Sequence, residues 1–105
     1  MTTIVGGTNI NKDLKALRGT VDFLVATPGR LLDHLQNYEL APKMSDLDFL
    51  IFDEADQLLD MGFRPDIERI LAILKNNERP GNQRQTLLFS ATFTQSIKDI
   101  AKMSL

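Results

Sequence analysis

An acidic tetrapeptide directly follows an apolar run near the middle of the chain. Asp53-Glu54-Ala55-Asp56 comes after Phe49-Leu50-Ile51-Phe52, which has the length and composition of a buried strand. A carboxylate at a strand end can hold magnesium, through water because this ion keeps much of its hydration. A neighbouring carboxylate can orient or deprotonate an attacking water. The pattern favours phosphate-cleaving chemistry, with Asp53 for the metal and Glu54 for the water. The alternative is that Asp53 caps a short helix and the other acids are solvated.

A second polar motif, Thr27-Pro28-Gly29-Arg30, follows the apolar run Val21–Ala26. Thr27 is predicted to cap a helix with Pro28 in its first position, which leaves the next two backbone amides free. The amino end of a helix favours an anion, yet this first turn contains no acid and places Arg30 at the positive end. A phosphate bound by the amides and the guanidinium would complete the arrangement. An ordinary helix cap with a surface arginine is the alternative.

The third motif is Ser90-Ala91-Thr92, which follows the apolar run Thr86–Phe89. Ser90 and Thr92 stand two residues apart, so an extended backbone would place both hydroxyls on the same side. We expect these hydroxyls to hydrogen-bond a carboxylate at a neighbouring strand end, and Asp56 is the candidate. The alternative is a strand end that turns into a helix cap.

Two further features carry weaker signals. Gly6-Gly7 follows Ile4-Val5 and fits either a tight turn or a close approach to a nucleic-acid backbone. His34 has no ligand partner in the sequence pattern and is predicted to lie on a solvated helix face.

The elements that must position these motifs are strands and helices in alternation. Apolar runs predict strands, and residues at helical spacing with cap signals predict the helices between them. This alternation predicts an α/β fold in which flanking helices cover both faces of a parallel sheet. The four motifs then share the edge at the carboxyl ends of the strands, where such folds bind ligands. Two connecting loops are expected, over Tyr38–Asp46 and Glu78–Gln83.

Length and composition limit the classes of protein. A chain of 105 residues predicts one compact unit. No apolar stretch approaches the roughly 20 residues that span a bilayer, and the first residues lack a secretory signal pattern. We therefore expect an intracellular protein with no membrane partner. The sequence contains no cysteine, which excludes disulfides and thiolate metal sites. Its net charge of −2 gives no global attraction to nucleic acid, so any such contact must be local.

In their order and spacing, the motifs resemble those of the DEAD-box ATP-dependent RNA helicases over nearly the whole chain. The resemblance implies a partial RecA-like domain of the P-loop NTPase class. It rests on Gly6-Gly7, Thr27-Pro28-Gly29-Arg30, Asp53-Glu54-Ala55-Asp56, Met61-Gly62-Phe63 and Ser90-Ala91-Thr92.

The resemblance also implies cofactors, partners and residue roles. Asp53 would serve magnesium and Glu54 the hydrolytic water of a bound ATP, while Asp56 would pair with the Ser90-Ala91-Thr92 motif to link ATP hydrolysis to RNA affinity. Sequence-independent binding of the RNA backbone is implied for Gly7, Thr27, Pro28, Gly29 and Arg30.

The chain departs from the family pattern in what it lacks. It contains no GxxxxGK[ST] phosphate-binding loop, no glutamine-containing adenine motif and no second RecA-like domain. We therefore expect residues 1–105 to be the C-terminal part of the first RecA-like domain, without the P-loop strand, and the rest of the helicase to be a partner. Without the P-loop and the second RecA-like domain, the isolated chain is predicted to be inactive. The Thr86–Phe89 strand would become an exposed edge, so the chain is also predicted to fold poorly or associate.

Two other functions fit parts of the pattern. A short non-catalytic protein could bind RNA or a partner through Thr27–Arg30. Another P-loop NTPase is a second alternative, because acid pairs after apolar strands are widespread in that class. The Thr-Pro-Gly-Arg and Ser-Ala-Thr motifs favour the helicase interpretation.

Overall fold

Strands and helices alternate along the chain as predicted. The structure is a computed structural model, and it describes residues 1–82 and 84–104. The strands are β1 (Thr2–Ile4), β2 (Leu24–Ala26), β3 (Phe49–Phe52) and β4 (Gln85–Leu88). The helices are α1 (Ile10–Ala16), α2 (Pro28–Asn37), α3 (Ala55–Asp60), α4 (Arg64–Asn76) and α5 (Gln95–Ser104), with a 3-10 helix η1 at Ala41–Asp46.

The two loop predictions fare differently. The segment Tyr38–Asp46 connects α2 to β3 as predicted, but its last six residues form the 3-10 helix. Proline in its first turn suits a helical start. The second loop, Glu78–Gln83, is irregular up to residue 82, and its last residue lies outside the described residues.

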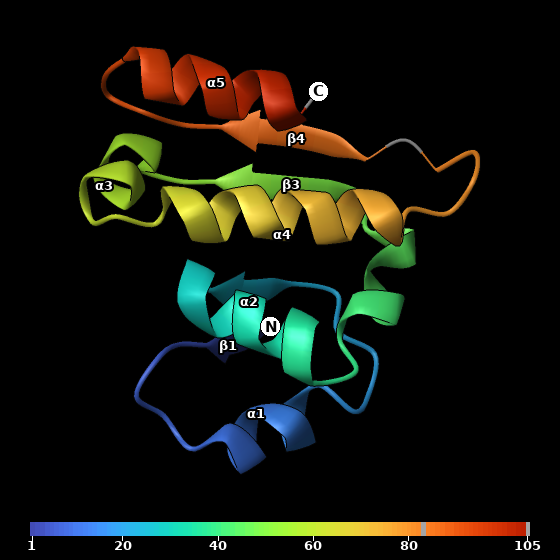
Figure 1. The fold of residues 1–105 in the computed structure, drawn as a ribbon. Coiled ribbons are helices and arrows are strands. Elements are labelled where there is room, and N and C mark those ends of the chain that lie inside the picture. Colours follow the sequence, from blue (N-terminus) through green and yellow to red (C-terminus); the bar gives the residue numbers. More distant parts are fainter. Residues whose placement is uncertain (83, 105) are drawn as a thin grey trace.

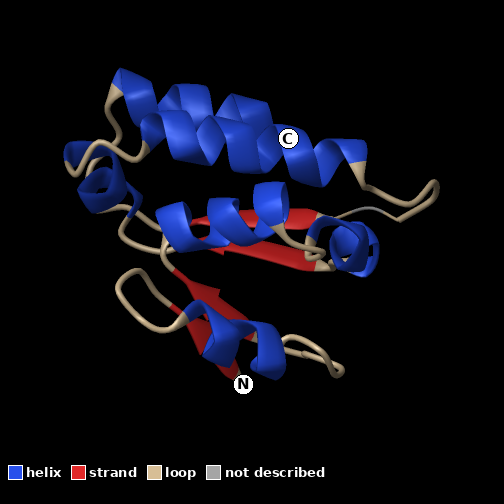
Figure 2. Ribbon diagram, turned by 60° about the horizontal axis from the view of Figure 1, so that its bottom comes forward, coloured by secondary structure: helices blue, strands red, loops and turns tan. Residues whose placement is uncertain are grey.

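All four strands run in the same direction, with their carboxyl ends at the left of Figure 1. β1 pairs with β2 and β3 pairs with β4, both in parallel, and each pair forms a two-stranded sheet. Within the described residues β2 and β3 share no ladder, and Figure 2 shows the two sheets inclined to each other. The α/β class with parallel strands is confirmed, but the sheet is divided into two halves.

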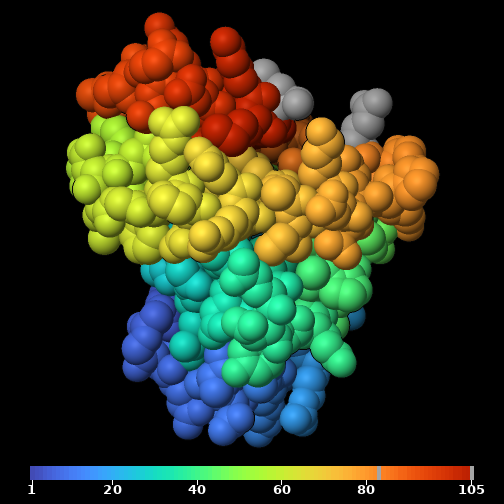
Figure 3. All heavy atoms as spheres, in the orientation of Figure 1, coloured from blue at the N-terminus to red at the C-terminus, as the bar shows by residue number. Residues whose placement is uncertain are grey.

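Helix α4 connects the cores of the two halves. Its apolar stripe is buried, with Ile70 and Leu74 in the core beside β1 and β2, and Ile67 and Leu71 in the core beside β3 and β4. Leu50 of β3 packs against both cores. Figure 3 shows the resulting shape, in which the N-terminal part lies below the α4 layer and the C-terminal helix above it. Packing of side chains, in place of a continuous hydrogen-bond ladder, therefore joins the halves.

One face of the strands is uncovered. Val25, Phe49 and Ile51 are 51%, 56% and 56% exposed, whereas their neighbours Leu50 and Phe52 face the core. The expectation that the strands are buried on both faces was therefore wrong for this chain. The reason is visible in Figure 2, where α4 and α5 lie on the same side of the strands. Among the described residues β4 pairs only with β3, so its other edge is free, as predicted.

Among the described helices, none has the length and apolar character needed to cross a bilayer.

Candidate functional site

The four sequence motifs all follow the carboxyl end of a strand, and they contact one another in two pairs. The backbone amide of Gly6 donates to Oγ1 of Thr27 at 3.4 Å, which links the turn after β1 to the start of α2. The amide of Ala55 donates to the carbonyl of Phe89 at 2.9 Å, which links the acidic motif to the residue before Ser90-Ala91-Thr92. Each pair thus spans two neighbouring strand ends.

A groove lies at the first pair. It has a volume of about 320 Å³ and is lined by Gly6, Thr27, Gly29, Arg30, Asp33 and Phe63. Gly7 adopts a φ of +83°, a backbone conformation that favours glycine, so the turn requires this residue type. The first amide of α2 that donates within the helix is that of Leu31, to the carbonyl of Thr27 at 3.0 Å. The amides that precede Leu31 are therefore not used by the helix.

Thr27 begins the helix as predicted but does not cap it with its side chain. Its backbone has the extended conformation of an N-cap residue, and no side-chain cap bond forms. The hydroxyl oxygen instead accepts the Gly6 amide. The Thr27 side chain therefore connects the turn after β1 to the start of α2 and does not cap the helix.

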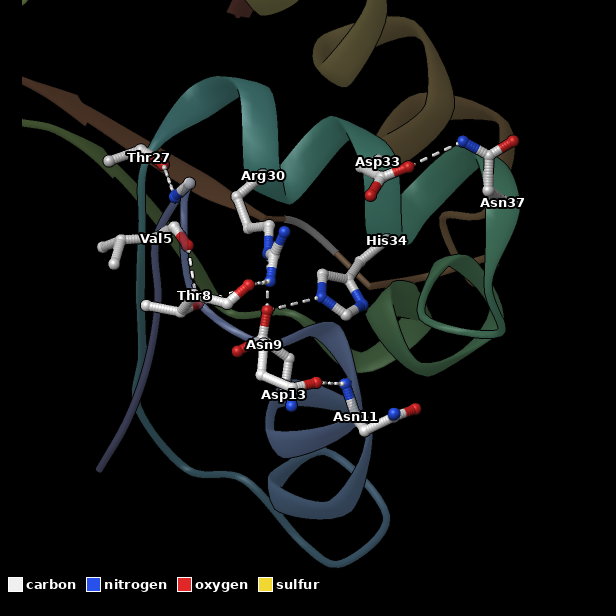
Figure 4. A network of polar contacts seen from close by, with 11 residues as sticks. Val5, Thr8, Asn9, Asn11, Asp13, Thr27, Arg30, Asp33, His34 and Asn37 are labelled. Atoms are coloured by element: carbon white, nitrogen blue, oxygen red, sulfur yellow. Dashed lines mark hydrogen bonds and ion pairs between the residues drawn. The ribbon is translucent and has the colours of Figure 1, made fainter.

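Arg30 is paired with an acid from another helix. Its Nε donates to Oδ2 of Asp13 on α1 at 2.6 Å, and its Nη2 donates to the carbonyl and hydroxyl oxygens of Thr8 (Figure 4). Its side chain is only 13% exposed. An external anion is therefore not needed to balance Arg30, contrary to the expectation, because Asp13 supplies the negative charge. The pairing spans 17 residues and cannot be seen in the first turn of α2 alone.

His34 is fully buried, so its predicted position on a solvated face was wrong. Its Nε2 lies 3.0 Å from Oδ2 of Asp13, and its ring stands 5.3 Å from the ring of Tyr38. His34 is four residues after Arg30, and this spacing places both side chains on one face of α2. That face turns toward α1, where Asp13 draws the imidazole inward.

Asp13 is ionised in this environment more readily than an ordinary aspartate. Burial disfavours the charge and is the largest single influence on its pKa. Hydrogen bonds from His34 and Arg30, together with their positive charge, outweigh burial, so the pKa of Asp13 lies below its ordinary value of 3.8. Asp13 is 4% exposed, and a carboxylate so buried is stable only when paired.

At the second pair of motifs, Asp53 and Glu54 are exposed at the end of β3. Among the described residues, neither carboxylate takes part in a hydrogen bond or ion pair that would occupy it. Glu54, with a left-handed backbone (φ 53°, ψ 51°), occupies the N-cap position of α3. The alternative in which Asp53 caps this helix is therefore not what the structure shows.

The donor set fits magnesium held largely by water and phosphates. Within residues 1–82 and 84–104, no group of three histidine, cysteine or acidic residues is arranged to enclose a metal ion. Magnesium in phosphate sites is usually bound through one or two carboxylates and keeps several waters. The free carboxylate of Asp53 meets that requirement, whereas a metal that needs an all-protein cage would find no such site here.

Asp56 contacts one of its two predicted partners. Oγ1 of Thr92 donates to Oδ2 of Asp56 at 3.4 Å, but the hydroxyl of Ser90 donates to the carbonyl of Thr92 at 2.8 Å. The expectation of a direct Ser90–Asp56 bond was wrong because β4 ends at Leu88. Beyond that residue the chain turns, so the two hydroxyls no longer share a side. Ala91 is exposed and has an apolar side chain, and it connects these two residues.

Asp13 and Thr8 are site residues that the sequence analysis missed. A signal for Asp13 exists in the sequence, because it lies three residues after Ile10 and four before Leu17, on the apolar stripe of α1. An acid on an inner face needs a buried partner. For Thr8, whose contact with Arg30 uses its backbone carbonyl, the sequence gives no such signal.

Comparison with known proteins agrees with this geometry. The family described as DEAD/DEAH box helicase matches residues 1–100. The chain is 44% identical over 102 residues to the ATP-dependent RNA helicase has1 of Aspergillus terreus, covering 97% of this chain and 17% of that protein. It is 43% identical over 103 residues to the ATP-dependent RNA helicase DRS1 of Scheffersomyces stipitis, covering 96% of this chain and 13% of that protein. The chain therefore spans less than a fifth of the length of these relatives.

Solved structures show the same fold. The yeast DEAD-box splicing factor Prp28 matches with a TM-score of 0.87 and 39% identity, over 96% of this chain and 22% of that one. The structure of Mss116p bound to ssRNA and AMP-PNP matches with a TM-score of 0.77 and 35% identity, over 99% of this chain and 21% of that one. The RecA-like fold and the resemblance inferred from the motifs are confirmed, and the chain belongs to the DEAD/DEAH box helicase family.

Proposed function

We propose that this chain is the C-terminal part of the first RecA-like domain of an ATP-dependent RNA helicase. Its role there is to hold the RNA backbone and to supply acidic residues to the ATP site. The observation that supports this most directly is the grouping of the four motifs at the carboxyl ends of parallel strands, where the motifs contact each other in pairs. The remainder of the helicase is its partner.

RNA binding is proposed for Gly7 and for Thr27, Pro28, Gly29 and Arg30. The groove between the Gly6-Gly7 turn and the start of α2 exposes backbone amides at the positive end of a helix. A related protein, Mss116p, has been solved with single-stranded RNA bound. Contacts of this kind reach phosphates and sugars, not base edges, so binding is independent of RNA sequence.

The ATP site is proposed to include Asp53 and Glu54. Asp53 would hold magnesium through water, and the ion, when bound with ATP, neutralises charge on the phosphates. Glu54 would orient or deprotonate the attacking water. The sequence contains no phosphate-binding loop, so this chain supplies one side of the site and is inactive alone.

The contact between Asp56 and Thr92 is proposed to couple the two activities. It joins Asp56, which follows Glu54 by two residues, to Thr92 in the loop after β4. Ser90 and Ala91 lie in the same loop and are proposed to take part in the coupling. The 3.4 Å separation makes a weak hydrogen bond that a small movement of α3 or of the loop after β4 would break or shorten. A change at the ATP site could in this way alter the position of the loop after β4, and with it the affinity for RNA.

The experiment replaces the matching segment of a full-length relative such as has1 of Aspergillus terreus with this chain. We expect the chimera to show RNA-stimulated ATP turnover, and Glu54→Gln to reduce it by roughly 10²–10⁴-fold. The free 105-residue chain should hydrolyse no ATP. The proposed division of the site would be contradicted if the free chain hydrolysed ATP and lost this activity in Glu54→Gln. It would also be contradicted if Glu54→Gln left the ATP turnover of the chimera unchanged.

A non-catalytic RNA-binding protein is a second candidate. The groove favours it, because its lining combines the Gly6-Gly7 turn with the start of α2 and includes neither Asp53 nor Glu54. In that case the free chain would bind single-stranded RNA without ATP. The affinity should then weaken with added salt, with a slope of about −0.7 per phosphate contact in a plot of log K against log salt concentration.

A further inference from the structure

A buried polar network stands behind the groove. Asp13, Arg30 and His34 are 4%, 13% and 0% exposed, and the carboxylate of Asp13 accepts from both of the other side chains. The network joins α1 to the first two turns of α2 (Figure 4). Side chains with so little exposed surface offer few atoms to a ligand in solvent. Their role therefore follows from their contacts with each other.

Arg30 connects this network to the glycine turn. One side of its guanidinium faces Asp13, while Nη2 donates to both oxygens of Thr8, the residue directly after Gly7. The Thr8 hydroxyl in turn donates to the carbonyl of Val5 at 2.9 Å. The turn that contains Gly6 and Gly7 is therefore closed by the Thr8–Val5 bond and tied to α2 through one planar fork.

His34 fixes the acid that holds the fork. Its Nε2 is 3.0 Å from the same oxygen, Oδ2, that accepts from Arg30. The imidazole is packed beside Tyr38 and has no exposed surface, so Asp13 cannot turn away without leaving the His34 ring unpaired and the Arg30 guanidinium without its counter-charge. The orientation of Arg30 is thereby set from α1 and α2 together.

We propose that Asp13 and His34 are positioning residues, which hold Arg30 as a cross-link between the Gly6-Gly7 turn and the start of α2 and so set the width of the RNA groove. This inference rests on the proposed function, since it assumes that the groove binds the RNA backbone. Arg30 then acts through the turn that it holds, and its charge is already neutralised by Asp13. The phosphate is left to the backbone amides that line the groove.

Arg30→Lys separates a cross-link from a point charge. Lysine keeps the positive charge and can still pair with Asp13, but it lacks the planar fork that reaches Asp13 and Thr8 at once. We expect the affinity of the chimera proposed above, in which this chain replaces the matching segment of a full-length relative, for a short single-stranded RNA to fall about tenfold, which corresponds to about 1.4 kcal/mol. The salt dependence should remain that of the wild type, because no phosphate contact is lost. Unchanged affinity, or a weaker salt dependence, would overturn the proposal.

The matched control is Arg79→Lys, which makes the same substitution at an exposed ion pair with Asp46 far from the groove. This variant should bind RNA like the wild type. An equal loss in Arg79→Lys and Arg30→Lys would show a general effect of replacing arginine and would count against the cross-link.

Asp13→Asn tests the sign of the effect. If Asp13 merely neutralises Arg30, removal of its charge frees a cation beside the groove and strengthens RNA binding. If Asp13 positions Arg30, binding weakens. Should this variant fail to fold, His34→Gln, which keeps a side-chain donor for Asp13, should retain most of the affinity and Arg30→Lys still decides.

Hydrogen exchange gives a measurement that needs no RNA. The amides of residues 6–8 should exchange faster in Arg30→Lys than in the wild type, while those in α4 should be unchanged. Absence of that local change contradicts the cross-link. If Arg30→Lys shows this local change but the wild-type chimera binds no RNA at low salt, the proposed function is refuted and the cross-link stands.

Discussion

Two ion-pair networks, one in each half of the molecule, hold helices beside the motifs in different ways. In the N-terminal half, Asp13 and Arg30 are 4% and 13% exposed. In the C-terminal half, Arg64 donates to Glu68, Ser96 and Asp99 and joins α4 to α5, but its side chain is 38% exposed. Exposed pairs contribute little to stability, whereas a buried charge that loses its partner is costly. Only the buried network can therefore impose a fixed geometry on the loops around it.

The pKa values of the two acids show the same contrast in their causes. For Asp13, burial opposes ionisation and is outweighed by His34 and Arg30. For Asp99, the hydrogen bond from Gln95 is the largest influence, and the pKa falls with further help from Arg64 against a smaller effect of burial. A neighbour on its own helix thus stabilises Asp99, while Asp13 depends on a different helix. The loss of tertiary structure should affect Asp13 more.

The largest expected effect is that of Asp13→Ala. Removal of the carboxylate leaves Arg30 and His34 buried without their partner, which typically costs about 3–5 kcal/mol. Since a small domain has roughly 5–15 kcal/mol of stability, a large part of it would be lost. Urea unfolding followed by circular dichroism measures the change.

Asp99→Ala is the comparison for that measurement. Its partner Arg64 keeps Glu68, Ser96 and solvent, so the midpoint of unfolding should move much less. If the two substitutions shifted the midpoint equally, burial would not be what distinguishes the two networks.

The contrast also explains which features could be predicted from the sequence. Elements such as α4 carry their signals locally, with Pro65 at the start and an apolar stripe of Ile67, Ile70, Leu71 and Leu74. The motif order then placed Asp53 and Glu54 at a strand end, where they are found. Strand topology was recoverable because apolar runs and helices alternate.

The tertiary partners of polar side chains could not be predicted in the same way. Arg30 and Asp13 are separated by 17 residues, and nothing near Arg30 indicates that α1 will turn an acid toward it. The burial of His34 follows from that same pairing. Ser90 was misplaced for a different reason, because the end of β4 at Leu88 depends on backbone geometry that hydroxyl spacing does not record.

The second expected effect concerns a feature that both halves share. Val25 in one sheet and Ile51 in the other are more than half exposed on the uncovered face, and β4 has a free edge. Exposed apolar strands promote association between chains. We expect light scattering to show oligomers of the isolated chain, and Val25→Lys with Ile51→Lys to reduce them while the circular dichroism spectrum is kept.

A monodisperse wild-type monomer with a cooperative melt would contradict this expectation. If Val25→Lys alone removed association, the N-terminal sheet would be the contact. If only Ile51→Lys did so, the C-terminal sheet would be.

The third effect is the dependence of stability on pH. Because the pKa of Asp13 is lower in the folded state than in the unfolded state, its contribution is present above about pH 4 and is lost as the pH falls through the folded value. The loss is smaller than in Asp13→Ala, because a protonated carboxyl keeps its volume and part of its hydrogen bonding. Thermal melts between about pH 5 and pH 3 should show it.

Asp13→Asn is the control for the acid range. This side chain cannot titrate, so its melting temperature should fall less steeply with acid than that of the wild type. Asp99→Asn should retain nearly the wild-type slope. Parallel slopes for the wild type and Asp13→Asn would mean that other carboxyls account for the acid sensitivity.

The smallest effect compares the backbone at the two motif pairs. At the N-terminal motif pair a positive φ is occupied by Gly7, whereas at the C-terminal motif pair it is occupied by Glu54. A left-handed conformation costs a residue with a side chain roughly 1–2 kcal/mol. Replacement by glycine removes this cost but lowers the stability by roughly 0.5–1 kcal/mol, because glycine gives the unfolded chain more conformational freedom. We expect Glu54→Gly to raise stability by about 0.5 kcal/mol and Gly7→Ala to lower it, as measured by urea unfolding.

A gain in Glu54→Gly would mean that the chain bears backbone strain in order to place a carboxylate at this position, as sites of chemistry often do. A loss would mean that the Glu54 side chain makes stabilising contacts that outweigh the strain, which would weaken its assignment to the water of the ATP site.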